Sequence, residues 1–108
     1  MSKHRVVYSP AALSDLDGIV SYIIDFFKDV KAAKSLSHLI RKKIRSLNEM
    51  PERYPLVEWE PWFSMKVHKI PVRNFVIYYT VDTDARLVTV IRIVYSGRNM
   101  QELIQNDH

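Results

Sequence analysis

Two stretches in the second half of the chain consist almost wholly of β-branched and aromatic residues. Residues 74–81 read NFVIYYTV and residues 87–95 read LVTVIRIVY, in which Arg92 is the single charge. The polar residues 82–86 between them favour a turn, so the two stretches are predicted to form an antiparallel hairpin. Because both faces of each stretch are largely apolar, we expect the two strands to lie in the middle of a sheet.

The first half of the chain predicts a short strand and two amphipathic helices. Residues 5–8 (RVVY) are typical of a strand, and Ser9 and Pro10 are typical of a helix N-cap and first helical position. Apolar residues then recur every three or four positions, first to about Phe27 and again over residues 30–48. The link between the two helices is short and offers Asp29 as the second N-cap, so we expect an antiparallel helical hairpin.

The segment between the helices and the hairpin is predicted to be a loop that leads into a third strand. Prolines at positions 51, 55 and 61 prevent regular structure. Trp59 and Trp62 in this loop are interpreted as covers over a core rather than as a binding platform. The third strand is predicted over residues 65–70, where Pro71 limits its length or causes a bulge before Arg73. Residues 99–104 are predicted to form one helical turn.

These elements predict an α+β fold in the order β-α-α-β-β-β with a short C-terminal helix. A chain of 108 residues is expected to form a single domain over residues 1–108. The N-terminal strand and the antiparallel helical hairpin would accompany an antiparallel sheet, and the hairpin would bury its apolar stripe against one face. The opposite face is therefore expected to remain partly uncovered and to carry the function.

Composition excludes several classes of protein. The chain has no cysteine, which excludes disulfides, thiol catalysis and cysteine-ligated zinc. No stretch is as long and apolar as a membrane span, and the N-terminus does not resemble a signal peptide, so we expect a cytoplasmic protein without membrane contact. No spacing of histidine or acidic residues suggests a metal site, and the two glycines form no phosphate-binding loop, so no cofactor is expected.

The basic excess lies in the first half of the chain. The formal net charge is +4, and residues 1–50 hold nine basic and five acidic residues, whereas residues 51–108 hold seven of each. The densest basic run is Arg41, Lys42 and Lys43, followed by Arg45. The run is interpreted as a solvated helix face that complements the helix dipole. The alternative is contact with nucleic acid or with an acidic protein partner.

Several polar residues in the strand region are candidates for chemistry. Strand alternation predicts that Arg92 shares a face with Val88, Val90 and Val94, so its charge needs a buried acceptor or a groove with a polar partner. RNA cleavage through the 2′-hydroxyl needs a base, an acid and cations near the phosphorane. The candidates for these roles are Lys66, His68, Lys69, Arg73, Arg92, Tyr95 and Arg98.

The predicted pleat does not bring all of these candidates together. Lys66 and His68 are two positions apart and would share a face, but Arg92 and Tyr95 would point to opposite faces. His68 has a suitable unperturbed pKa for proton transfer. Without a matched second group, however, it is interpreted as a surface or interface residue.

The sequence resembles the RelE/ParE superfamily of toxins from type II toxin–antitoxin modules. The resemblance rests on the order and spacing of residues 8–11 (YSPA), 15–16, 19–22, 47–55, 69–79 (KIPVRNFVIYY), 81–82 and 90–98 (VIRIVYSGR). It implies a helical hairpin packed on a curved antiparallel sheet. It also implies one of two activities, which are ribosome-dependent cleavage of messenger RNA in the RelE-like branch and inhibition of DNA gyrase in the ParE-like branch.

The resemblance favours the ParE-like branch. The position that matches a catalytic arginine of the ribonucleases is Val76, the expected basic residue after the last strand is found only as a shifted Arg98, and the terminal tyrosine falls near Leu103. We therefore expect a toxin that binds gyrase, with Lys66, Tyr95, Arg41, Lys42 and Lys43 as contact residues. The alternative is a metal-independent endoribonuclease with Arg92, His68, Arg73 and Arg98 as catalytic residues and Lys66 beside them.

A non-toxic binding module is a second alternative. Both toxin hypotheses imply a cognate acidic antitoxin, which would form a hetero-oligomer with the chain. Its extended or helical segment would lie along the apolar helices or the open sheet face, and the basic run at residues 41–45 would attract it.

Overall fold

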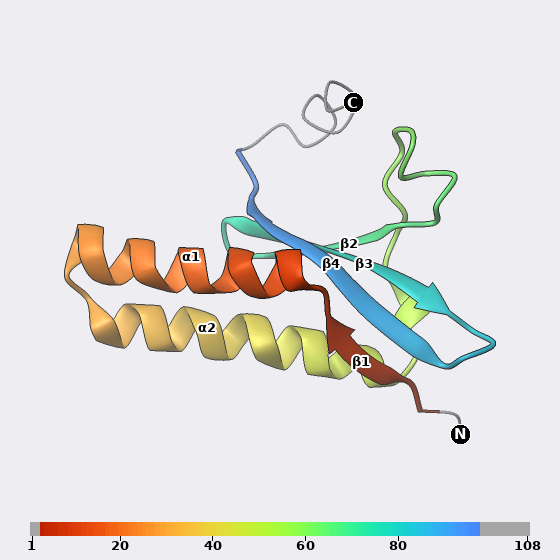
Figure 1. The fold of residues 1–108 in the computed structure, drawn as a ribbon, viewed down its shortest axis with the longest axis horizontal. Helices are drawn as coiled ribbons and strands as arrows, with labels where there is room; N and C mark the ends of the chain where they lie inside the picture. Colours follow the sequence, from red (N-terminus) through yellow and green to blue (C-terminus); the bar gives the residue numbers. More distant parts are fainter. Residues whose placement is uncertain (1–2, 98–108) are drawn as a thin grey trace.

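The computed structural model describes residues 3–97 and has two helices packed on a four-stranded sheet (Figure 1). The predicted α+β fold class is confirmed. The elements are β1 (Arg5–Tyr8), α1 (Pro10–Phe27), α2 (Val30–Arg45), two short 3₁₀ turns (Ser46–Asn48 and Pro51–Arg53), β2 (His68–Val72), β3 (Phe75–Asp82) and β4 (Leu87–Tyr95). The predicted helical turn at residues 99–104 lies outside the described residues.

The sheet has the strand order β1-β4-β3-β2, so the two apolar strands β3 and β4 are central, as predicted. The β2–β3 and β3–β4 pairs are antiparallel. The N-terminal strand β1 pairs in parallel with β4, with Val6 opposite Val88. A parallel pair needs a long connection, and between β1 and β4 the chain forms both helices and the strands β2 and β3. The expected antiparallel sheet is therefore a mixed sheet with one parallel edge.

Local signals set the two helices and their link. The Ser9 hydroxyl accepts a hydrogen bond from the Ala12 amide, and an Asp29 carboxylate oxygen accepts one from the Ala32 amide. Lys28 closes α1 in the left-handed conformation, with φ of 56°, so the chain reverses within two residues. Helix α2 ends at Arg45 rather than near residue 48, because the chain tightens into a 3₁₀ turn.

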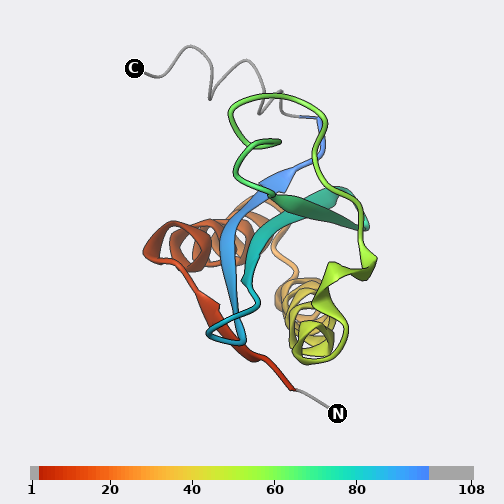
Figure 2. The same cartoon turned by 90° about the vertical axis from the view of Figure 1, so that its right-hand side faces the viewer.

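The main core lies between the helical hairpin and one face of the sheet. In Figure 2, α1 lies beside β4, the blue strand. It is formed by Ala12, Leu16, Ile40, Ile44, Leu47, Ile70, Val72, Ile77, Tyr79, Val88, Val90 and Ile93. The Tyr79 hydroxyl donates a 2.6 Å hydrogen bond to the Pro51 carbonyl, which satisfies the one polar atom of this buried ring. The far end of the hairpin extends past the sheet (Figure 1).

The predicted bounds of the third strand were wrong. Strand β2 begins at His68 instead of residue 65, because residues 61–66 form turns that end at Lys66 with φ of 58°. Pro71 does not end the strand but pairs with Val76 inside it. A proline is tolerated there because β2 is the last strand of the sheet, and the bridge on its other side, from Leu56, is made at His68 and not at Pro71.

The sheet face opposite the helices carries a second apolar cluster. Val57, Trp62 and Val67 of the proline-rich segment pack on Tyr78 and Val94 of the sheet. The Trp62 ring lies 4.9 Å from the Tyr78 ring and 5.0 Å from the Trp59 ring, between centroids. The interpretation of the tryptophans as core covers is confirmed. The part of the face that we expected to stay open is therefore filled where this cluster lies.

Within residues 3–97, no helix has the length and apolar character needed to cross a membrane.

Candidate functional site

Arg92 lies beside an irregularity in the β3–β4 ladder that alternation alone does not predict. Tyr79 pairs with Val90 and Tyr78 pairs with Arg92, so Ile91 is an extra residue in β4. Such a bulge reverses the facing of the residues that follow it. The prediction that Arg92 shares a face with Val88 and Val90 was therefore wrong. Arg92 does share a face with Val94, which comes two residues after it and beyond the bulge.

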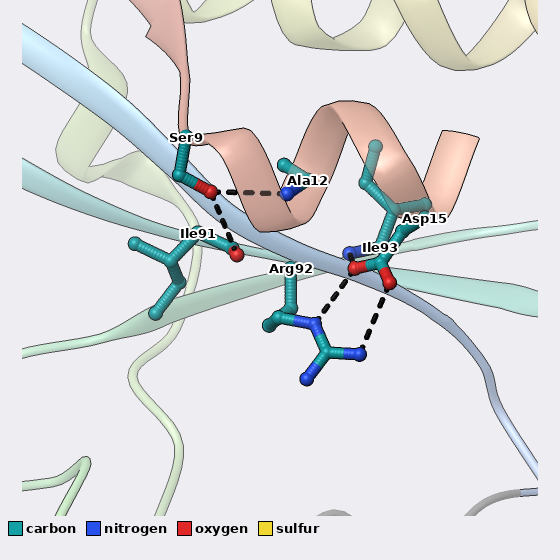
Figure 3. A network of polar contacts seen from close by, with 6 residues as sticks. All are labelled: Ser9, Ala12, Asp15, Ile91, Arg92 and Ile93. Carbon is teal, nitrogen blue, oxygen red and sulfur yellow. Dashed lines mark hydrogen bonds and ion pairs between the residues drawn. The ribbon is translucent and has the colours of Figure 1, made fainter. Parts of the chain in front are cut away.

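The Arg92 guanidinium binds Asp15 of α1 (Figure 3). Its Nε donates to Asp15 Oδ2 at 2.7 Å and its second amino group donates to Oδ1 at 3.0 Å. The Ile93 amide donates to the same Oδ2 at 2.9 Å. The hydrogen bond to Asp15 raises the pKa of Arg92, against a smaller opposing effect of burial. The sequence left two possibilities for the Arg92 charge, a buried acceptor or a groove with a polar partner. The structure shows an acceptor, the partly buried carboxylate of Asp15.

The bulge is also held from the start of α1. The Ser9 hydroxyl that caps the helix donates a 3.0 Å hydrogen bond to the Ile91 carbonyl (Figure 3). Ser9 and Asp15, at the start of one helix, thus hydrogen-bond to the Ile91 carbonyl and to the Ile93 amide beyond it. The sequence offered no signal for this arrangement, since Asp15 lies 77 positions before Arg92.

His68 is part of the core side of the sheet. It is only 8% exposed, pairs with Tyr79 across β2 and β3, and stacks on the Tyr79 ring at a centroid distance of 5.0 Å. Its Nδ1 lies 2.7 Å from the Tyr54 carbonyl oxygen. His68 was interpreted as a surface or interface residue, and the surface alternative was wrong, because the register of β2 turns the side chain toward the helices.

Among the described residues, six other predicted site residues are exposed but lie on different parts of the molecule: Lys66, Arg73, Tyr95, Arg41, Lys42 and Lys43. Lys66 lies in the turn before β2 and so does not share a strand face with His68. Arg73 lies in the β2–β3 turn, with φ of 56°, and Tyr95 ends β4. Arg41, Lys42 and Lys43 lie in the last part of α2. Arg98 lies outside the described residues.

One open groove brings some of these residues together. It lies between the hairpin and the adjoining ends of β3 and β4, and Lys42, Arg73 and Tyr95 line it. Its apolar lining includes Ile19, Tyr22, Ile23, Phe27, Leu36, Leu39, Phe75, Ile93 and Val94. Arg92, His68 and Lys66 are not among its lining residues. The groove was missed at the level of sequence because it depends on how far the hairpin extends past the sheet.

Gly18 marks the part of the groove beside α1. A Cβ atom added at Gly18 would meet no other atom within 4 Å, so this point of the helix surface faces open space. Glycine is a poor helix former, and packing among residues 3–97 does not explain its presence in the middle of an 18-residue helix. Among residues 3–97, no group of three or more histidine or acidic side chains is arranged to bind a metal ion.

Comparison with known proteins assigns this fold to a family. The family model described as the ParE toxin of the type II toxin–antitoxin system parDE matches residues 6–100. The chain therefore belongs to the ParE toxin family of type II toxin–antitoxin systems, and the superfamily resemblance seen in the sequence is confirmed. Among curated protein sequences, none matches the chain.

Solved structures share the fold at low sequence identity. A chain of the chromosomal ParDE system from P. aeruginosa has a TM-score of 0.70 and 16% identity, covering 86% of this chain and 96% of that one. A chain of the RelBE2 toxin–antitoxin complex from Mycobacterium tuberculosis has a TM-score of 0.61 and 16% identity, with 91% and 97% covered. The isolated E. coli RelE toxin has a TM-score of 0.61 and 18% identity, with 94% and 96% covered.

Proposed function

We propose that this ParE-family toxin arrests growth by binding DNA gyrase and does not itself cleave RNA. The observation that supports this most is the state of the sheet face opposite the helices. A RelE-like ribonuclease is expected to carry its catalytic residues there. In this chain Val76, Tyr78 and Val94 occupy that face, and Trp62 packs over it.

Two of the candidates for RNA cleavage, Arg92 and His68, are engaged in contacts within the chain. A cation that stabilises a phosphorane has to approach the phosphate directly, but two nitrogen atoms of Arg92 are hydrogen-bonded to Asp15. A general base has to reach the 2′-hydroxyl within about 3 Å. His68 is buried on the other side of the sheet with its Nδ1 beside the Tyr54 carbonyl. These contacts favour a toxin that acts by binding.

We also propose that a cognate antitoxin neutralises the toxin by occupying the groove between the hairpin and the sheet, in the cytoplasm. The M. tuberculosis RelBE2 structure is a toxin–antitoxin complex, and the structure from Pyrococcus horikoshii is a RelE–RelB complex. In this chain the groove has an apolar lining together with Lys42 and Arg73. Arg41 and Lys43 are the sequence neighbours of Lys42. That composition suits an acidic segment with an apolar stripe.

The test is inducible expression without an antitoxin, with DNA, RNA and protein synthesis followed by pulse labelling. We expect DNA synthesis to stop first, with induction of DNA-damage signalling. The purified toxin should inhibit supercoiling by purified gyrase. An early fall in protein synthesis with messages cut at codon positions would overturn the proposal in favour of the ribonuclease. Normal growth with the folded protein present would favour the non-toxic module.

Two variants separate catalysis from structure. Arg92→Lys and His68→Gln should keep gyrase inhibition at any temperature at which each variant is folded. A ribonuclease that used these side chains would lose cleavage in both variants even when folded. Circular dichroism on the same samples provides the control for folding.

A further inference from the structure

The end of the helical hairpin carries an aromatic cluster that is largely exposed among residues 3–97. We define this tip patch as Tyr22, Phe26, Phe27 and Val30, which are 55%, 67%, 61% and 49% exposed. The hairpin extends past the sheet at this end, so none of the four described strands lies over the patch (Figure 1). Exposed apolar patches of this kind commonly mark protein–protein contact sites.

The three rings of the tip patch are already packed against one another. The Tyr22 and Phe26 rings are stacked with a centroid distance of 5.2 Å. Phe27 meets Phe26 at 5.1 Å and Tyr22 at 5.9 Å, both edge to face. Because the rings hold each other in place, little side-chain entropy remains to be lost when a partner covers them.

The charges around the tip patch differ from those on the rest of α2. The tip carries Asp25, Lys28, Asp29 and Lys31, so its formal charges cancel. The later part of the same helix, residues 34–45, has five basic residues and no acidic one. An acidic antitoxin is attracted to that basic part, but it gains no net attraction at the tip.

We propose that the tip patch binds the tip patch of a second copy of this chain in a two-fold symmetric contact. In such a contact the same surface is used on both sides, so the patch has to be complementary to itself. A central group of aromatic rings bordered by equal numbers of acidic and basic residues meets that requirement. Asp25 of one copy is then opposed by a lysine of the other, with the rings buried between them.

The arrangement leaves most of the antitoxin groove accessible. Phe26 and Val30 are not among the lining residues of the groove, whereas Tyr22 and Phe27 are. A tip-to-tip dimer therefore joins two toxin chains without covering Lys42 or Arg73. The inference concerns assembly and does not depend on whether gyrase is the target.

The test is sedimentation equilibrium of the purified toxin, alone and in complex with its antitoxin. We expect the wild-type toxin alone to form a dimer. The double variant Phe26→Ser, Val30→Ser should weaken dimerisation about tenfold or more, as loss of aromatic anchors does. Met65→Ser is the matched control, because Met65 is also 55% exposed but lies outside the patch. It should dimerise like the wild type.

A charge reversal tests the symmetric pairing. Asp25→Lys should weaken the dimer, and adding Lys28→Asp should restore it, because the tip charges are then balanced again. Antitoxin affinity should stay within about twofold in all these variants. A wild-type monomer at every concentration would overturn the proposal. Unchanged mass with reduced antitoxin affinity in the Phe26→Ser, Val30→Ser variant would also overturn it, and would assign the patch to the antitoxin.

Discussion

Asp15 and Arg92 are 77 positions apart in the sequence and are joined by two hydrogen bonds between α1 and β4. The same carboxylate accepts the Ile93 amide. Asp15 thus binds a side chain and a backbone group directly after the extra residue Ile91. Since the side chains of Arg92 and Asp15 are 29% and 16% exposed, water screens the pair only in part. The contact fixes the position of the helical hairpin relative to the strand beneath it.

Replacing Asp15 with alanine should destabilise the protein more than replacing its partner Arg92 with lysine. Asp15→Ala leaves both the guanidinium and the Ile93 amide without their acceptor, so the free energy of unfolding should fall by about 2–3 kcal/mol. Arg92→Lys keeps a charge but loses the two-point contact and should lower it by about 1 kcal/mol. Urea unfolding followed by circular dichroism measures both. Asp17→Ala, on the exposed side of the same helix, is the control and should change little. Equal effects for Asp15→Ala and Asp17→Ala would contradict the assigned role.

Stability should fall at alkaline pH because of Tyr79. Burial raises the pKa of Tyr79 well above its ordinary value, although Arg53 lowers it slightly. A group whose pKa is raised by folding contributes stability below its unfolded pKa, near 10, and loses that contribution as the pH rises. The free energy of unfolding should therefore decrease above about pH 10. Urea unfolding at a series of pH values measures the slope.

Tyr79→Phe should separate the hydrogen bond from the titration. At neutral pH the variant loses the bond to the Pro51 carbonyl and should be less stable by about 1 kcal/mol. Above about pH 10 its stability should decrease less steeply than that of the wild type. Some slope remains, because burial also raises the pKa values of Tyr8 and Tyr78. Tyr22→Phe, on an exposed ring, should match the wild type, and an identical slope in Tyr79→Phe would refute the explanation.

The fold was predictable where the signal is local. The β-branched runs of β3 and β4, the Ser9 and Asp29 caps and the two helical stripes each lie within a few residues of what they determine. The start of β2 was not predictable. The residue types before His68 favour a strand, but the chain turns at Lys66. There the packing of Trp62 and Val67 on the sheet outweighs local preference.

The candidate site was predictable only in part, because its geometry depends on distant contacts. Period-two alternation placed Arg92 with Val88 and Val90, but the bulge at Ile91 reverses that placement. The bulge is held by Ser9 and Asp15, which no pattern within β4 reveals. Likewise, the facing of His68 follows from its register with Tyr79, which is set by the pairing of two strands.

The second cluster should contribute strongly to stability through Trp62. The ring is only 6% exposed and contacts Tyr78 and Trp59. Trp62→Ala should lower the free energy of unfolding by about 3–5 kcal/mol, because it removes buried area and leaves a cavity. Phe63→Ala is a matched control at the next position, where the ring is 47% exposed, and it should have a much smaller effect. Urea unfolding compares the two, and similar losses would mean that the cluster does not support the sheet face.

Substitutions at Gly18 should separate the stability of the toxin from its binding to the antitoxin. Gly18→Ala adds a Cβ atom that meets nothing within 4 Å and improves helix propensity, so it should stabilise the protein by about 0.5–1 kcal/mol. Gly18→Trp should fold equally well but place an indole ring in the groove beside Ile19 and Tyr95. If the groove binds the antitoxin, its affinity for the Trp variant should fall at least about tenfold, whereas the Ala variant should bind normally. Isothermal titration calorimetry measures both affinities. Normal binding by folded Gly18→Trp would exclude this part of the groove from the antitoxin contact.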